Sequence, residues 1–201
     1  KHWSSAAASY RRAIEVKPND VLAIRSLNNL GSVNFELGNY AEAEEAYRKA
    51  IERNPVYADA LVNLGNTYQQ RAFALPEGNT RRRELLNTAI EQYGKALKIL
   101  PNHSAAYGNM GFALFNIGAF KRADTAYRRA VFLDPRAYNA LNNLGNLYLT
   151  LGQRAMGNGE DGRSYFRQAE IFFKQSWIIN PAYQKSKRGF EVARRLLHSP
   201  P

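Results

Sequence analysis

Residues 104–137 read SAAYGNMGFALFNIGAFKRADTAYRRAVFLDPRA, and this 34-residue stretch decides the fold class. Its apolar residues recur at steps of three and four, which is the spacing of one face of an amphipathic helix. Gly111 lies in its first half, and Ala123 and Tyr127 lie in its second half. Pro135 follows, and proline ends a helix because it lacks a backbone N–H and clashes with the preceding turn. The stretch therefore predicts two amphipathic helices joined by a turn.

The same pattern recurs along the chain, so the protein is built from repeats. The recurring prolines are Pro18, Pro55, Pro101, Pro135 and Pro181. Twelve residues before each proline stands an alanine, and eight before stands an aromatic residue: Tyr10, Tyr47, Tyr93, Tyr127 and Phe173. Four units also carry a glycine further upstream: Gly31, Gly65, Gly111 and Gly145. Glycine and alanine remove side-chain bulk, so we expect them where two helices approach closely.

This pattern resembles the tetratricopeptide repeat, a helix–turn–helix unit of 34 residues. The resemblance implies an all-α fold, a right-handed α-solenoid of antiparallel helix pairs, with a single array over residues 1–198. Its parts are a half repeat at 1–18, full repeats at about 24–57, 58–103, 104–137 and 138–183, a polar capping helix at 184–198, and a linker stub at 199–201. The chain departs from the pattern in one 37-residue and two 46-residue proline spacings, and it lacks the usual tryptophan.

Each 46-residue unit carries 12 extra residues between its helices. In the first, Pro76-Glu77-Gly78-Asn79 predicts the turn, and Thr80 is predicted to cap a lengthened second helix. In the second, residues 156–162 predict a glycine-rich turn. This turn contains the spacing GxGxxG, but a dinucleotide fingerprint needs a preceding strand, and here the flanking segments are helical. Surface elaboration and contact with a partner are both open readings of these insertions.

Composition excludes several function classes. The chain has 201 residues, 45% hydrophobic and 22% charged, which is typical of a soluble folded protein. It has no cysteine, so disulfides, thiolate zinc sites and iron–sulfur clusters are excluded. Its three histidines have no metal-ligand spacing and no partnered nucleophile. We therefore expect neither an enzyme nor a bound metal or cofactor. No apolar stretch reaches the ~18 residues of a membrane span, and the compartment is not fixed, although the cytoplasm is slightly favoured.

The resemblance also implies a binding surface, because in this family the first helix of each repeat lines a concave groove. The sixth position of that helix is asparagine in all four complete repeats: Asn29, Asn63, Asn109 and Asn143. The ninth position adds Asn66, Phe112 and Asn146, and the apolar candidates include Phe115. Asparagine carries both a donor and an acceptor, so stacked amides suit the backbone of an extended peptide. This is similar to the asparagine ladder of the O-linked N-acetylglucosamine transferase superhelix. The alternative is that asparagine merely suits a polar helix surface.

The groove positions lack the lysines and arginines with which chaperone-tail readers of this family clamp a terminal carboxylate. The second position holds Arg25, Asp59, Ala105 and Asn139 in the four repeats. The fifth position holds Asn28, Val62, Gly108 and Asn142. We therefore do not expect recognition of chaperone C-termini.

The leading hypothesis is a non-enzymatic scaffold that binds a peptide segment of a partner protein in its groove. The alternatives are a substrate-recognition arm of a larger enzyme, a basic surface that binds RNA or an acidic protein, and self-association. The formal charge of +11 comes entirely from residues 61–201, because residues 1–60 hold eight basic and eight acidic side chains. The candidate basic surface consists of Arg81, Arg82, Arg83, Arg128, Arg129, Lys185 and Arg188. Since these positions lie outside the groove, nucleic acid ranks below a peptide as the predicted partner.

Overall fold

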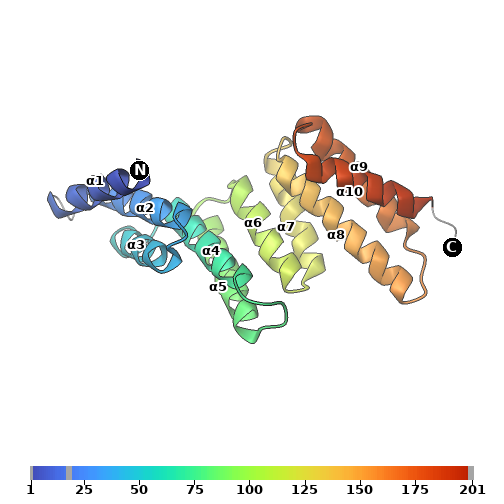
Figure 1. The fold of residues 1–201 in the computed structure, drawn as a ribbon, viewed down its shortest axis with the longest axis horizontal. Helices are drawn as coiled ribbons and strands as arrows, with labels where there is room; N and C mark the ends of the chain where they lie inside the picture. The colour runs from blue at the N-terminus through green and yellow to red at the C-terminus, as the bar shows by residue number, and fades with distance from the viewer. Residues whose placement is uncertain (1, 17–19, 199–201) are drawn as a thin grey trace. The chain divides into compact units, whose positions relative to one another are not determined.

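A computed structural model of the chain describes residues 2–16 and 20–198; Pro18 and the predicted linker stub lie outside the described residues. Within them the chain forms ten α-helices and no strand (Figure 1). The helices are α1 (His2–Val16), α2 (Val21–Glu36), α3 (Tyr40–Arg53), α4 (Ala58–Phe73), α5 (Thr80–Ile99), α6 (Ser104–Asn116), α7 (Phe120–Leu133), α8 (Tyr138–Gly157), α9 (Arg163–Ile179) and α10 (Gln184–Leu197). The prediction of an all-α helical-repeat fold is confirmed.

The chain divides into two compact units, residues 1–102 and residues 103–201. In unit 1, α2 pairs with α3 and α4 with α5, while α1 packs on α2 and α3 packs on α4. In unit 2, α6 pairs with α7 and α8 with α9, α7 packs on α8, and α10 covers α8 and α9. Each repeat is thus one helical hairpin, as its two-helix sequence pattern predicts.

The repeat glycines face the repeat aromatic residues. A Cβ atom built on Gly31, Gly65, Gly111 or Gly145 would lie within 2.5–2.7 Å of the ring of Tyr47, Tyr93, Tyr127 or Phe173, respectively. All four rings are buried. Each glycine therefore makes room for one aromatic ring of the second helix. The sequence predicted only that the two helices approach closely at the glycine, and the structure adds which side chain fills the space.

The turns of the two short hairpins require glycine. Gly38 and Gly118 have φ values of +78° and +81°, a left-handed conformation that other L-residues adopt only with strain. Both follow the last turn of a first helix. They reverse the chain within three residues and thereby bring the two helices of the hairpin together.

The second helix of the long hairpin in unit 1 is capped one residue earlier than predicted. The Asn79 Oδ1 atom accepts a hydrogen bond of 2.8 Å from the Arg81 backbone N–H, so Asn79 is the N-cap of α5. Thr80 is the first helical residue, and its prediction as the cap is wrong. Either residue type suits a cap, and the asparagine occupies the position from which its side chain reaches the second helical N–H.

Both insertions lengthen a hairpin and bury its seam. Leu85 and Leu86 are buried in the extension of unit 1. In unit 2, a Cβ atom on Gly152 would lie 2.5 Å from the ring of Phe166, which is fully buried. This contact lies seven residues from Gly145 on α8 and seven from Phe173 on α9, so the extension repeats the packing of the main hairpin.

Buried tyrosines should make the protein sensitive to alkaline pH. Burial raises the pKa of the Tyr93 and Tyr127 hydroxyls above the ordinary value. In the unfolded chain both would ionise near pH ~10. The stabilisation is therefore complete below that pH and is lost progressively as the pH rises above it, toward the raised pKa of the folded protein.

We expect urea denaturation, followed by helicity, to show a free energy of unfolding that falls as the pH rises above the unfolded-state pKa of about 10. Tyr127→Phe should make this fall shallower with little change at neutral pH, since repeat 138–183 already uses Phe173 at this place. Identical pH curves for the variant and the parent protein would contradict the assignment.

Candidate functional site

In unit 1 the structure separates the predicted asparagines by role. Asn63 is half-buried, and its Nδ2 atom donates a hydrogen bond of 3.1 Å to Oδ1 of the buried Asn28. This amide pair ties α4 to α2 across consecutive repeats. Asn29 is exposed, and its side chain makes no hydrogen bond with any residue in the described ranges. Asn28 thus has a structural role, and Asn29 presents its amide to solvent.

Unit 2 repeats this division at the equivalent positions. Asn142 is buried, and its Oδ1 atom accepts a hydrogen bond of 3.2 Å from Ser186 of α10. The Ser186 hydroxyl in turn lies 2.7 Å from that of Ser176. Asn143 is half-buried and Asn146 is exposed, and neither amide is engaged by the part of the chain that the structure describes. The predicted Asn109 lies half-buried on α6.

The ninth position of the first helix serves the repeat tyrosine. The Tyr93 hydroxyl donates to Asn66 Oδ1 over 2.8 Å, and the Tyr47 hydroxyl donates to Ser32 Oγ over 3.1 Å. The carbonyl of Asn66 is therefore used inside its own hairpin. Asn146 stands at the same position opposite Phe173, which has no hydroxyl, and this explains why the Asn146 amide stays exposed.

The predicted aromatic anchors pack largely within their hairpins. The ring of Phe115 lies 5.6 Å from that of Phe120, the first residue of α7. Phe35 makes the same contact with Tyr40, at 5.5 Å. Phe112 is half-buried on α6. Phe115 thus closes the turn between α6 and α7 and offers a partner only its remaining surface.

Sequence reasoning missed Gln69, which stands at the position equivalent to Phe35 and Phe115. Gln69 is buried on α4, and its Oε1 atom has no hydrogen-bond partner among the described residues. A buried acceptor without a donor is unfavourable by about 1–3 kcal/mol. The sequence does contain a signal that could have identified Gln69, because the equivalent position is phenylalanine in two other repeats.

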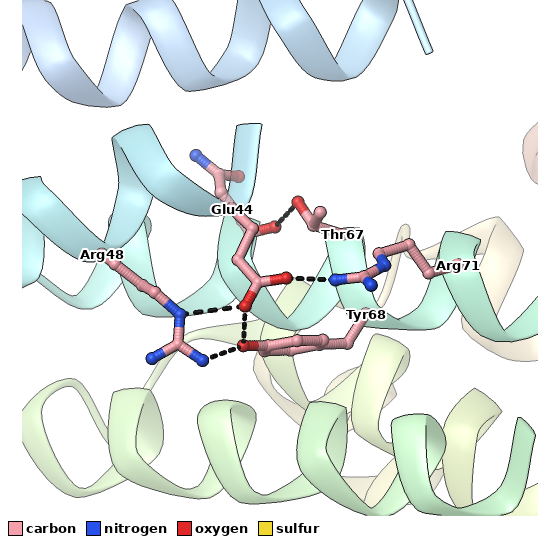
Figure 2. Close-up of polar contacts among 6 residues, drawn as sticks. Glu44, Arg48, Thr67, Tyr68 and Arg71 are labelled. Carbon is pink, nitrogen blue, oxygen red and sulfur yellow. Dashed lines mark hydrogen bonds and ion pairs between the residues drawn. The ribbon is translucent and has the colours of Figure 1, made fainter. Parts of the chain in front are cut away.

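A polar cluster around Glu44 links consecutive repeats in unit 1 (Figure 2). Glu44 Oε1 accepts hydrogen bonds from Arg48 Nε, at 2.9 Å, and from the Tyr68 hydroxyl, at 2.7 Å. Arg48 also donates to that hydroxyl over 2.6 Å, and Arg71 pairs with the second carboxylate oxygen. Burial, followed by the Glu44 carboxylate, raises the pKa of Tyr68. The cluster fixes α4, which carries the asparagine positions, against α3.

Unit 2 contains the equivalent cluster at the same register. Arg128 Nε lies 2.9 Å and 3.0 Å from the two Asp124 carboxylate oxygens, and its Nη2 atom donates to the Tyr148 hydroxyl over 2.7 Å. Tyr148 donates in turn to Asp124 over 3.0 Å. A carboxylate, an arginine four residues later and a tyrosine on the next helix thus recur as a unit. That recurrence is a sequence signal that pairwise inspection of the repeats would have found.

Most members of the predicted basic surface already have partners. Arg82 donates to the Leu75 carbonyl and lies over the ring of Phe73, and it thereby holds the long turn of unit 1. Arg81 pairs with Glu84 at 2.8 Å. Arg129 lies over the rings of Tyr107 and Phe132. The remaining members, Arg83, Lys185 and Arg188, are exposed.

Within residues 5–16 and 20–198, no three His, Asp or Glu side chains gather in a way that could hold a metal ion. Among the helices described, none combines the length and the apolar character needed to cross a membrane.

Three sequence profiles, each described as tetratricopeptide repeat, match residues 24–57, 46–91 and 109–176. The chain belongs to the tetratricopeptide repeat family. Proteins of this family generally mediate protein–protein interactions, and the fold is typically a non-enzymatic scaffold, although some relatives are transferases.

Two curated relatives show how the chain compares with longer repeat proteins. The small glutamine-rich tetratricopeptide repeat-containing protein 2 of Mycosarcoma maydis is 32% identical over 116 residues, covering 58% of this chain and 30% of that protein. A probable UDP-N-acetylglucosamine–peptide N-acetylglucosaminyltransferase, SPINDLY of Hordeum vulgare, is 32% identical over 127 residues, covering 63% of this chain and 12% of that protein. The chain therefore spans a minor part of the length of each.

Solved structures agree on the fold. A thermophilic tetratricopeptide repeat protein of Thermus thermophilus superposes with a TM-score of 0.73 at 18% identity, covering 96% of this chain and 90% of that one. The first repeat domain of Spaghetti (RPAP3), bound to the HSP90 peptide SRMEEVD, gives 0.58 at 22% identity, covering 66% and 95%.

Proposed function

We propose that this chain is a protein-interaction scaffold whose first helices bind an extended segment of a partner protein. The observation that carries the proposal is the division of roles on α8. Asn142 is buried and hydrogen-bonded, whereas the adjacent Asn143 and the nearby Asn146 make no hydrogen bond within residues 20–198. Amides without an internal role, three residues apart and therefore on one helix face, can donate to and accept from a peptide backbone.

The proposal extends to the exposed Asn29 in unit 1 and resembles the asparagine ladder of the O-linked N-acetylglucosamine transferase superhelix. The Spaghetti structure supports it in general terms, since that repeat domain holds a peptide. The match to SPINDLY is in keeping with a shared repeat type. Asn63 and Asn66 contribute differently, because the amides of both are engaged in hydrogen bonds inside unit 1.

Magnitudes limit what the amides do. A net hydrogen bond contributes about 0.5–1.5 kcal/mol, while ordering a peptide residue costs about 1–2 kcal/mol. Asparagines therefore set the register of the peptide, and apolar contacts must supply most of the affinity. The half-buried Phe112 and the outer surface of Phe115 are the apolar groups that we assign to this role.

Replacing both Asn143 and Asn146 by alanine should weaken peptide binding about 5- to 150-fold, which corresponds to two hydrogen bonds of about 0.5–1.5 kcal/mol each. A phage-displayed library of 12-residue peptides supplies the probe, and the selected peptide is then titrated against each variant by fluorescence anisotropy. Helicity should be unchanged, because neither amide bonds to the described chain.

The matched control is Asn87→Ala, which removes an exposed asparagine from α5, a second helix. This control should leave the affinity unchanged. Equal weakening by the control and by the double variant, or full affinity of the double variant, would reject the first-helix surface as the peptide site.

A second candidate function is substrate recognition within a larger enzyme. SPINDLY is described as a probable peptide N-acetylglucosaminyltransferase, and the matched region covers 12% of it. In this case the chain would contribute binding through the same first helices, and the chemistry would lie elsewhere. Sequencing the full reading frame distinguishes the two: a catalytic domain joined to this chain supports the second candidate, and its absence rejects it.

A further inference from the structure

The outer, second helices of unit 1 border two open clefts with the same chemistry. One cleft, of about 380 Å³, lies between α1 and α3 over α2, and the other, of about 530 Å³, lies between α3 and α5 over α4. Leucines form both floors, Leu27 and Leu30 in one and Leu61 and Leu64 in the other. The rims carry charges of both signs.

Unit 2 has different residues at the rim positions. Glu52 lies three residues before its repeat proline, and its equivalent on α7 is Phe132. Glu91 lies ten before its proline, and its equivalent on α9 is Ile171. Lys98 of α5, which is next in sequence to the cleft-lining Ile99, is replaced by Ile178 of α9. Three charged positions have become apolar.

The centre of the equivalent region in unit 2 is packed with rings. Phe172 of α9 takes the place of Gln92, which lines the larger cleft of unit 1. Its ring lies 5.5 Å from the ring of Tyr148, and the guanidinium of Arg128 lies 5.8 Å and 5.5 Å from the centroids of Tyr148 and Phe172. This stack supports α7 and α9 against α8 and leaves the apolar rim residues on the surface.

These rim residues are strongly exposed. The exposed fractions are 73% for Phe132, 67% for Ile178 and 43% for Ile171. Since charged residues serve the same structural positions in unit 1, folding does not require apolar side chains there. Single exposed apolar side chains are ordinary on a folded domain, so what distinguishes these three is that they stand where unit 1 has charged residues. We call Phe132, Ile171 and Ile178 the outer patch.

The surroundings of the outer patch are basic. On α9, Arg167, Ile171, Lys174 and Ile178 follow at steps of four, three and four, and therefore lie along one face of the helix. On α7, the Arg129 guanidinium lies 5.1 Å from the centroid of Phe132. The acidic residues nearby are Glu170, Asp134 and Asp124, whose carboxylate is already bound by Arg128, and the cations of α7 and α9 outnumber them. The complement of this surface is an acidic segment with apolar side chains.

We propose that the outer patch of unit 2 docks an acidic amphipathic segment of a partner protein. This surface lies on the second helices and does not depend on the first-helix asparagines. A second copy of the chain fits poorly, because two basic patches repel each other. Nucleic acid fits less well than an acidic amphipathic segment, because Phe132 is the one ring among the three patch residues, and Ile171 and Ile178 offer no surface on which a base can stack.

The test restores the pattern of unit 1 with F132E and I171E, so that each new glutamate copies a residue which the chain already places at the equivalent position. The probe is a fluorescein-labelled synthetic 18-residue peptide with leucine at heptad positions a and d and glutamate or alanine elsewhere. A second peptide has lysine in place of glutamate, and a third has alanine in place of leucine. Binding is measured by anisotropy at 150 mM salt.

We expect the acidic leucine peptide to bind at least tenfold more tightly than either control peptide, and the double glutamate variant to lose at least tenfold. A neutral variant, F132Q with I171Q, should lose binding as well, because it removes apolar surface without adding charge. N143A with N146A should bind the acidic peptide unchanged, which separates this site from the first-helix surface. Helicity of every variant is checked by circular dichroism.

Three results would overturn the proposal. The first is equal binding of the acidic peptide by the parent protein and both patch variants. The second is a parent protein that is dimeric by light scattering, with patch variants that are monomeric and no peptide bound, which would assign the patch to self-association. The third is tighter binding of a 15-nucleotide single-stranded RNA than of the peptide, lost in the same variants.

Discussion

Phe173→Ala is expected to lower the free energy of unfolding by about 3–5 kcal/mol, the usual range for truncating a fully buried phenylalanine. Phe173 has no exposed surface and packs with Ala169 and Ala193. Gly145 and Gly189 both face its ring, so that a Cβ atom on either would come within 2.7 Å. On the sides of Gly145 and Gly189 there is no side chain that could collapse into the space. The cavity would persist, which places the effect in the upper part of the range.

Phe173→Tyr is the matched control for this truncation. The hydroxyl would lie where those of Tyr47 and Tyr93 lie in their hairpins, and Asn146 stands at the position from which Ser32 and Asn66 accept. We expect a change within about 1 kcal/mol of the parent protein, with stabilisation if the new hydrogen bond forms. Urea denaturation followed by far-ultraviolet circular dichroism measures both variants. A loss for Phe173→Tyr as large as that for Phe173→Ala would contradict the described packing.

Gly65→Ala is expected to lower the free energy of unfolding by about 1–3 kcal/mol, even though alanine is the better helix former. The added methyl group would lie 2.5 Å from the Tyr93 ring, which is buried and held by its hydrogen bond to Asn66. Either the ring or helix α4 must shift. A shift of α4 would also displace Asn63 and its bond to Asn28.

Gly94→Ala, in the same hairpin, is expected to change the free energy of unfolding in the opposite direction. Gly94 lies in α5, next to Tyr93 in sequence, and a Cβ atom there would meet nothing within 4 Å. Alanine should therefore stabilise the protein by about 0.5–1 kcal/mol, because it removes the entropy loss of a glycine in a helix. Thermal and urea denaturation of both variants test the pair. The same sign for both changes would show that helix propensity, rather than the contact with the ring, decides the effect of Gly65.

The helix pairs were predictable because they depend on the spacing of residues along the sequence. The spacing of Gly65, Tyr93 and Pro101 gives the hairpin and its end, and the residues around Pro76 give the long turn. The choice of Asn79 over Thr80 as the cap was not predictable in this way, since both residue types cap helices. Such one-residue errors depend on which side chain reaches the free N–H groups.

The partners of polar side chains were not predictable from one repeat at a time. Asn28 and Asn63 are 35 residues apart, and only the distance between α2 and α4 decides that their amides pair. The same applies to the Glu44 carboxylate and the Tyr68 hydroxyl. The outer patch could not be predicted from the sequence, because a phenylalanine such as Phe132 is usually a core residue. Its exposure is known only from the packing of the helices.

The paired glycine–ring contacts of the long hairpin in unit 2 limit how such a protein can change length. Gly145 faces Phe173 and Gly152 faces Phe166, so the two contacts are seven residues apart on each helix. Seven residues make about two turns, whereas deleting one residue would rotate all following side chains by about 100°. A glycine would then point away from the ring that needs it. A further glycine–ring contact in such a hairpin should therefore lie seven residues, about two turns, from the existing contact on each helix.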